Sequence, residues 1–248
     1  MRKDLIIHEA PKSPVSEAVR TLRTNLTYKM NKTGAKMFLI TSSAPGEGKS
    51  WTASNLAIAF TQSKQRVLII DADLRKGRQH EVFNIDNTVG LSSVLNSKKI
   101  CKGSVYLDEE MDKLIQSTGI ENLYVVPTGI TPHNPSELLE SEQFEAILEN
   151  LKDRFDVIIV DAPPANIVTD SIVLCNKVDG VILTCGIGKA RRETLLETKE
   201  KILSVGGNIL GVVINKMPMD KMKYYAKDYS HYTSNQMIKY DEKLRKIS

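Results

Sequence analysis

The stretch Thr41-Ser42-Ser43-Ala44-Pro45-Gly46-Glu47-Gly48-Lys49-Ser50 lies between an apolar run at 37–41 and a helical pattern over 49–63. A glycine-rich turn from a strand into a helix directs backbone N–H groups and the helix N-terminus at phosphate oxygens. Gly46 and Gly48 allow the backbone to approach a ligand closely, and Gly48-Lys49-Ser50 is the ending of a P-loop. The stretch therefore predicts an α/β domain that binds a nucleoside triphosphate.

The whole loop is expected to surround the phosphates. Lys49 would reach the β- and γ-phosphates, and the Ser50 hydroxyl would ligate Mg²⁺. Ser43 stands where the usual pattern has its first glycine, and the alternative is a glycine-rich turn followed by a chance Lys-Ser. The expected nucleotide-binding residues of the loop are Ser43, Ala44, Pro45, Gly46, Glu47, Gly48, Lys49 and Ser50.

Apolar runs and helical patterns alternate along the rest of the chain. Such alternation predicts a P-loop NTPase-like α/β fold, with a mostly parallel central sheet and helices on both faces. We expect an N-terminal segment at 1–35, a P-loop domain at 36–218 and a tail at 219–248. The expected strands are 37–41, 67–70, 123–126, 157–160, 181–185 and 210–214, and the expected helices are 16–30, 49–63, 91–95, 135–152, 169–176 and 189–205.

Two of the apolar runs end in carboxylates. One leads into Asp71-Ala72-Asp73-Leu74-Arg75, and the other leads into Asp161. Ligands of an open parallel sheet bind beyond the carboxyl ends of its strands, so these side chains are expected to converge with the P-loop. Asp161 fits a Mg²⁺ ligand, Asp73 is a second candidate for the metal, and one of Asp71 and Asp73 would accept a proton. A turn or a helix cap is the ordinary alternative for a single strand-end Asp.

Asn215 follows the last apolar run and is a candidate contact for the nucleotide base. A turn-forming Asn is an almost equally good interpretation. Asn215-Lys216 resembles the start of a guanine-recognition motif, but Pro218 stands where GTPases place an Asp. ATP is therefore the expected nucleotide.

The composition excludes several classes of protein. The 248 residues are 41% hydrophobic, which excludes wholesale disorder, and the three Cys contain no CxxC pair, which excludes a disulfide framework. A net charge of +4 does not by itself imply nucleic-acid binding, and no nucleic acid is expected. The apolar runs are all shorter than the ~18 residues of a spanning helix, so a cytoplasmic protein is expected. A dehydrogenase is disfavoured because no GxGxxG follows a strand.

The three motifs together resemble those of the bacterial tyrosine kinases, the P-loop protein kinases of capsule and exopolysaccharide synthesis. The matching stretches are Pro45–Ser50, Ile70–Arg75 and Val160-Asp161, and the resemblance extends from about residue 13 to the end. It implies transfer of the ATP γ-phosphoryl group to tyrosine with Mg²⁺ as cofactor. The implied catalytic residues are Lys49, Asp71, Asp73 and Asp161, with Asp71 favoured over Asp73 as general base, and the implied metal ligands are Ser50, Asp73 and Asp161.

Both ends of the chain also match this family. Glu17, Arg20 and Arg23 match a Glu-x-x-Arg-x-x-Arg stretch that packs one subunit on the next in a homo-oligomeric ring. The alternative is that these residues form an ordinary solvated helix face. The tail resembles the family's autophosphorylation cluster, which a neighbouring copy phosphorylates, and its alternative is an aromatic docking segment. The tail tyrosines are Tyr224, Tyr225, Tyr229, Tyr232 and Tyr240.

The chain resembles the split form of the family, in which a separate transmembrane protein activates a cytoplasmic kinase. That partner would be a regulator of polysaccharide chain length that recruits the kinase to the inner face of the plasma membrane, and a counteracting tyrosine phosphatase is also expected. Two other functions are weighed against the kinase. One is a MinD/ParA-like positioning ATPase without kinase activity, but such proteins usually carry another Lys where Ser43-Ala44 stands. The other is a non-enzymatic regulator of polysaccharide assembly.

Overall fold

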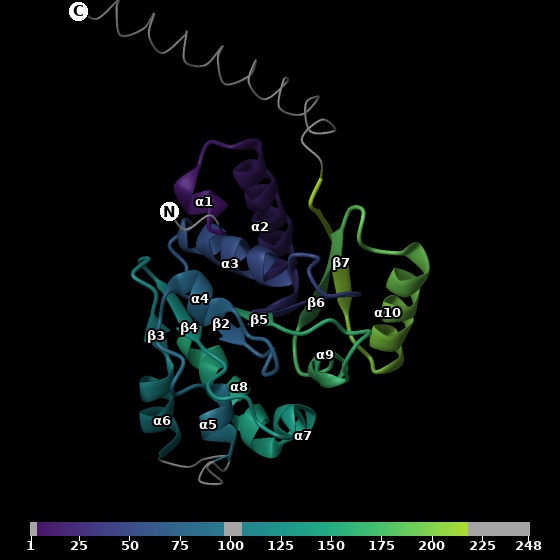
Figure 1. The fold of residues 1–248 in the computed structure, drawn as a ribbon. Helices are drawn as coiled ribbons and strands as arrows, with labels where there is room; N and C mark the ends of the chain where they lie inside the picture. Colours follow the sequence, from purple (N-terminus) through teal and green to yellow (C-terminus); the bar gives the residue numbers. More distant parts are fainter. Residues whose placement is uncertain (1–3, 97–105, 218–248) are drawn as a thin grey trace, which may run out of the picture.

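A central seven-stranded sheet organises the computed structural model, which describes residues 4–96 and 106–217 (Figure 1). The strand order is β3-β4-β2-β5-β1-β6-β7, with β3 antiparallel to β4 and the other neighbours parallel. This confirms the expected mostly parallel sheet. The strands are Met37–Ser42 (β1), Val67–Asp71 (β2), Gln116–Ser117 (β3), Leu123–Val126 (β4), Val157–Asp161 (β5), Gly180–Gly186 (β6) and Ile209–Asn215 (β7).

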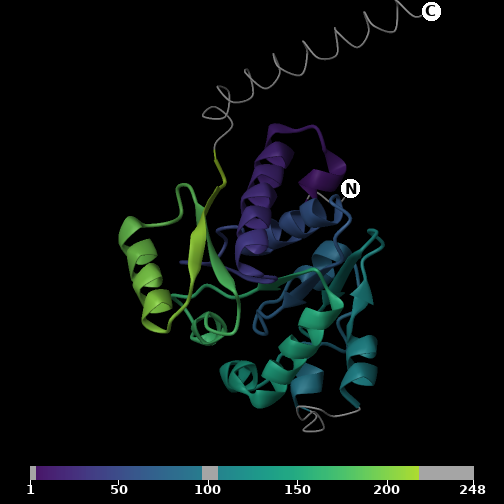
Figure 2. The same ribbon diagram turned by 180° about the vertical axis from the view of Figure 1, so that it is seen from behind.

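Helices cover both faces of the sheet (Figures 1 and 2). Helices α1 to α4 pack on one face, and α5 to α8 with α10 pack on the other. They are Ile6–Glu9 (α1), Pro14–Thr33 (α2), Lys49–Thr61 (α3), Gln79–Phe83 (α4), Leu91–Asn96 (α5), Tyr106–Leu114 (α6), Pro135–Glu140 (α7), Glu142–Arg154 (α8), Asp170–Leu174 (α9) and Arg192–Ser204 (α10).

The inner strands are apolar throughout because both of their faces are buried. In β2, Leu68 and Ile70 belong to the core beneath α8, whereas Val67 and Ile69 belong to the core beneath α3. Successive side chains of a strand point to opposite faces, so a continuous apolar run is what a doubly covered strand requires.

The expected helices all occur with somewhat different bounds, and for two of them the structure shows the cause of the difference. The stretch expected as one helix over 135–152 is divided at Ser141, whose extended backbone ends α7 and whose side chain accepts from the Phe144 N–H at the start of α8. The helix expected to begin at Ser16 begins at Pro14 instead, because Ser13 accepts the Ser16 N–H as an N-cap. None of the helices in the two described ranges combines the length and hydropathy needed to cross a membrane.

Candidate active site

The P-loop connects β1 to α3 and forms one wall of a cleft at the carboxyl ends of the strands. Gly46 and Gly48 have φ of 72° and 98°, which side chains other than glycine rarely adopt. A Cβ on Gly48 would lie 1.9 Å from Asn215 Nδ2, so only glycine fits at this position. Five of the eight expected loop residues line the cleft: Pro45, Gly46, Gly48, Lys49 and Ser50.

The other three loop residues hold one another instead of lining the cleft. The buried Glu47 carboxylate accepts hydrogen bonds through Oε2 from the Ser43 hydroxyl (3.1 Å) and from the Ala44 N–H (2.9 Å). Ser43, which replaces the first glycine of the usual pattern, is fully buried by this contact. These residues therefore shape the loop from behind, while their side chains stay away from the phosphate side.

Residues of the P-loop, Asp73 with Arg75, and Pro163 with Pro164 border one cleft of about 580 Å³, whereas the buried Asp71 and Asp161 are not among its lining residues. This convergence agrees with the position of ligand sites in open parallel sheets. Beyond the P-loop, the residues that line the cleft are Asp4, Trp51, Asp73, Arg75, Lys76, Arg78, Pro163, Pro164, Ile167, Val168, Asn215 and Lys216.

Two buried carboxylates lie side by side behind the loop. Asp71 ends β2 and Asp161 ends β5, and the two are register partners in the sheet with fully buried side chains. Gln79, at the start of α4, connects them: its backbone N–H donates to Asp71 Oδ2 (2.8 Å), and its Nε2 donates to Asp161 Oδ2 (2.8 Å). The same amide accepts from the Ser54 hydroxyl of α3 at 2.9 Å.

Burial makes both carboxylates unusually weak acids. The pKa of Asp71 is raised well above its ordinary value, first by burial and then by the neighbouring charge of Asp161. Burial also raises the pKa of Asp161 to about 6, against the nearby Ser50 hydroxyl, the Gln79 hydrogen bond and the charge of Lys49, which lower it. Two neighbouring carboxylates that are costly to ionise and lie next to a cleft are typical of a catalytic or metal-binding centre.

The residues present fit a Mg²⁺ ion. Asp71 Oδ1 and Asp161 Oδ1 are both buried without a hydrogen-bond partner, so each carboxylate keeps one oxygen available. A fully buried polar atom without a partner is rare unless an ion, water or substrate completes it. Carboxylate and hydroxyl oxygens are also the hard ligands that Mg²⁺ prefers, and Ser50 lies on the same side of the cleft.

Asp73 and Arg75 extend this site toward solvent. Asp73 lines the cleft, and its Oδ1 accepts the Lys76 N–H at 3.0 Å. Arg75 also lines the cleft and forms a bidentate ion pair with the buried Asp170, at 2.9 Å from Nε to Oδ2 and 3.1 Å from Nη2 to Oδ1. Sequence reasoning did not identify Gln79 or Asp170, because neither belongs to a recognisable motif.

Asn215 lies at the end of β7 against the P-loop. Its Nδ2 donates to the Glu47 carbonyl at 3.2 Å, and its Oδ1 accepts the Lys216 N–H at 2.7 Å. The side chain lines the cleft while it supports the loop, and its contact with a base stays a prediction.

The residues expected to join subunits make contacts within the single chain. Glu17 and Arg20 form an ion pair one turn apart on α2. Arg23 Nη1 donates to the Ala59 carbonyl of α3 at 3.1 Å, so it helps to hold α2 on α3. The tail tyrosines expected to accept phosphate lie outside the described residues.

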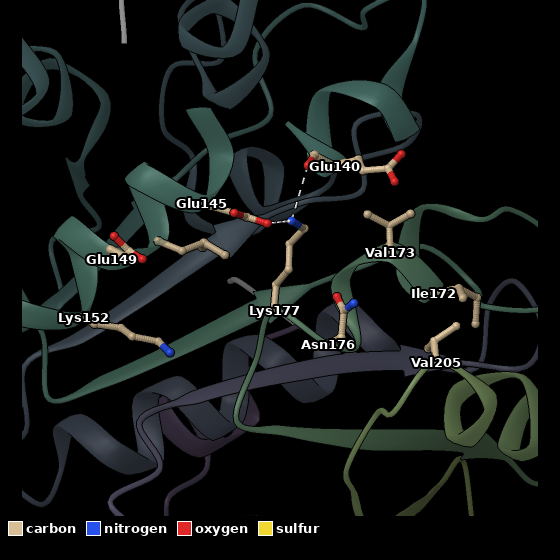
Figure 3. A pocket seen from close by; sticks show the side chains of 10 residues that line it. Glu140, Glu145, Glu149, Lys152, Ile172, Val173, Asn176, Lys177 and Val205 are labelled. Carbon is tan, nitrogen blue, oxygen red and sulfur yellow. Dashed lines mark hydrogen bonds and ion pairs between the residues drawn. The ribbon is translucent and has the colours of Figure 1, made fainter. Parts of the chain in front are cut away.

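A second hollow, of about 690 Å³, lies between α8 and the segment that follows α9 (Figure 3). Figure 3 shows Lys177 pointing toward Glu145 and toward the Glu140 carbonyl, which lies 3.4 Å from its Nζ. Lys152, on the same wall, pairs with Asp179 at 3.3 Å. The residues that line this hollow belong to none of the three motifs, so the cleft at the P-loop is the candidate active site.

Comparisons with known proteins agree with this geometry. A family model described as an AAA domain matches residues 35–190. The tyrosine-protein kinase YwqD of Bacillus subtilis is 37% identical over 226 residues, which cover 91% of each chain. The crystal structure of the chimerical protein CapA2B2 matches with a TM-score of 0.79 and 38% identity, over 87% of this chain and 91% of that one. The kinase domain of the Escherichia coli tyrosine kinase ETK has a TM-score of 0.77 and 33% identity, over 86% of this chain and 82% of that one.

The fold and the cleft define a P-loop enzyme of the class that binds ATP. The chain belongs to the bacterial tyrosine-protein kinases within that class, as the extent of the match to their sequences and kinase domains shows. MinD of Pyrococcus horikoshii, a septum site-determining protein, is more distant, with a TM-score of 0.58 and 18% identity over 78% of this chain and 76% of that one. That likeness shows the shared fold alone.

Proposed function

We propose that this kinase phosphorylates the C-terminal tyrosines of neighbouring copies of itself and thereby regulates the synthesis and export of capsular or extracellular polysaccharide. The observation that carries the proposal is the buried pair Asp71–Asp161 at the ends of β2 and β5, beside the cleft that the P-loop and Asp73 line, in a chain that belongs to the bacterial tyrosine kinases. The tyrosines at 224–240 are the proposed substrate groups, and the first of them follow soon after Lys216, which lines the cleft.

The chain's own residues have distinct parts in the transfer. Lys49 and the loop N–H groups hold the β- and γ-phosphates, and Asn215 contacts the base. Ser50 and Asp161 hold Mg²⁺ with Asp73 beside them. The bound ion would neutralise charge on the phosphates and orient them.

The reaction moves one phosphoryl group and one proton. The tyrosine oxygen forms a bond to the γ-phosphorus, the bond from that phosphorus to the β–γ bridging oxygen breaks, and ADP leaves. The phenolic proton passes to a carboxylate. Asp71 is favoured because it matches the first Asp of the family motif and lies beside Asp161 at the ends of the strands, whereas Asp73 competes for the role because it lines the cleft.

The ends of the chain connect this chemistry to an assembly. Residues 1–35 act as an oligomerisation segment through Glu17, Arg20 and Arg23, residues 36–218 form the kinase domain, and residues 219–248 form the phosphorylated tail. The tail carries seven Lys/Arg against four Asp/Glu, so several phosphates would reverse its charge and release it from a neighbouring site. A transmembrane regulator of polysaccharide chain length activates the cytoplasmic ring at the plasma membrane, and a tyrosine phosphatase reverses the modification.

Intact mass after incubation with ATP and Mg²⁺ tests the proposal. The wild-type chain should gain steps of about 80 Da, the mass of one phosphoryl group, while Lys49→Met should gain none. Hydrolysis of ATP without any gain in mass would instead favour the positioning ATPase. A second comparison separates the two candidate bases: if Asp71 accepts the proton, Asp71→Asn should abolish transfer and Asp73→Asn should leave part of it.

A further inference from the structure

A relay of hydrogen bonds through the buried Asp170 connects Arg75, at the cleft, to Ser136 in the segment Asn134-Pro135-Ser136. The mechanism above gives this segment no role. Asp170, at the start of α9, is fully buried and accepts both hydrogen bonds of the Arg75 fork. The same carboxylate accepts the Ser136 hydroxyl at 2.6 Å, and that hydroxyl also lies 3.1 Å from the Thr169 hydroxyl. Three elements that are far apart in sequence therefore meet at one carboxylate.

The relay leaves Arg75 with donors to spare. A guanidinium has five N–H groups in a rigid plane, and Asp170 uses one on Nε and one on Nη2. Arg75 remains 41% exposed and borders the same cleft as Lys49 and Ser50. A cation whose orientation is fixed from behind, with free donors at a phosphate site, is suited to bind phosphate oxygens in a defined geometry.

The burial of Asp170 shows that the contact is more than a surface ion pair. An ionised carboxylate without solvent needs a cation and several hydrogen bonds, and Arg75 with Ser136 supplies them. Arg78, three residues further along the chain, offers a contrast: it also borders the cleft, but its partner Glu81, at 3.4 Å, is 61% exposed and cannot fix it in the same way.

We propose that Arg75 binds the terminal phosphate of ATP and that Asp170, held by Ser136, is the residue that positions it. The inference rests on the proposed function only in taking ATP as the ligand of the cleft. Arg75 would meet the γ-phosphate and the charge that develops on it during transfer, so its loss should weaken ATP more than ADP.

The test compares nucleotide affinity with turnover in the full-length chain. Fluorescent ATP and ADP analogues are titrated with Mg²⁺ present, and phosphotyrosine formation is followed separately. Arg75→Lys and Asp170→Asn should each reduce the preference for ATP over ADP by roughly tenfold or more, the range of a charge-assisted hydrogen bond, and should reduce kcat together with it. Ser136→Ala should reduce both in the same direction by a smaller factor.

The double variant separates positioning from a merely structural role. If Asp170 acts through Arg75, adding Asp170→Asn to Arg75→Lys should cause no further loss of the preference for ATP over ADP. Glu81→Gln, which removes the partner of the neighbouring Arg78, is the matched control and should change neither quantity. An unchanged ATP preference in Asp170→Asn or Arg75→Lys, or full additivity in the double variant, would overturn the proposal.

The two proposals fail in different ways. Should the wild-type chain bind ATP but form no phosphotyrosine, the proposed function fails while the effect of Asp170 on ATP preference still stands. Ser136→Ala keeps the ion pair and the buried charge. It therefore tests whether the contacts of Asp170 set the ATP preference even if Asp170→Asn folds poorly.

Discussion

Asp161, a candidate site residue, lowers the free energy of unfolding because its carboxylate is buried. In the folded chain its pKa is raised to about 6 from 3.8, so between those values the folded protein keeps a proton that the unfolded chain has lost. The free energy of unfolding therefore falls as pH rises through this window, and the loss of stability caused by the ionised Asp161 is fully present above about pH 6. Two pKa units correspond to about 3 kcal/mol as an upper bound.

Asp161→Asn should consequently stabilise the nucleotide-free protein at pH 7.5 by about 1–3 kcal/mol while it abolishes transfer. The amide keeps an acceptor for Gln79 Nε2 and removes the buried charge. Urea denaturation at pH 4 and pH 7.5 measures the effect, which should be small at the lower pH. Asp153→Asn, on the exposed side of α8, is the control. An equal gain at both pH values would contradict the argument.

Gln79 is the second residue whose role can be measured. Gln79→Leu removes the donor to Asp161 Oδ2 while the backbone N–H to Asp71 is retained. Since that donor lowers the pKa of Asp161, its loss should move the acidic limb of the pH–rate profile to higher pH and reduce activity about tenfold or more. Gln79→Glu should be worse, because it adds a third carboxyl group to a buried pair. A pH profile identical to wild type would refute this assignment.

The contrast between predicted and missed residues has a physical cause. Lys49, Asp71 and Asp161 follow apolar runs or glycines, and these local patterns identify them. Gln79 contacts Asp161, which lies 82 positions away in the sequence, and Asp170 contacts Arg75, which lies 95 positions away. No pattern in the residues next to Gln79 or Asp170 indicates these contacts.

At the scale of elements, burial on both faces made the inner strands predictable. Strands β1, β2, β4 and β5 occur within one residue of the expected bounds because each is a continuous apolar run. Helices α1 and α4 and strand β3 were not predicted, since four or five residues, or two, are too few to show a period, and the longer helix α6 was not predicted either. The division between α7 and α8 was missed because Ser141 interrupts an otherwise continuous helical pattern.

Helix α1 depends on one side chain of α3. Asn55 is fully buried, its Oδ1 accepts the Ile7 N–H at 3.1 Å, and its Nδ2 donates to the Asp4 carbonyl at 2.7 Å. Asn55→Ala should weaken this docking by about 1–3 kcal/mol and speed hydrogen exchange at residues 5–10 without affecting β5. Asn55→Asp should be at least as disruptive, because it buries a carboxylate and sets one of its oxygens against the Asp4 carbonyl in place of the donor. Equal acceleration throughout the chain would indicate global destabilisation instead.

For the whole molecule, the position of the cleft relative to the tail matters most. Lys216 lines the cleft and the tyrosines begin at 224, so a short chain segment separates the active site from its proposed substrate. Tyr224 and Tyr225 follow Lys216 closely, whereas Tyr240 lies much further along the chain, so distance in sequence does not by itself select either route. Proximity in sequence therefore does not favour phosphorylation within one copy.

A mixing experiment decides between the two routes. One full-length variant carries Lys49→Met and keeps its tyrosines, and the other keeps Lys49 but has Phe at 224, 225, 229, 232 and 240. Transfer between copies predicts that the Lys49→Met chains gain phosphate only in the mixture, at a rate that rises with total protein concentration. Each variant alone serves as the control and should gain none on the tail. Transfer within one copy predicts no tail phosphate in the mixture, because no chain then has both a working P-loop and tail tyrosines.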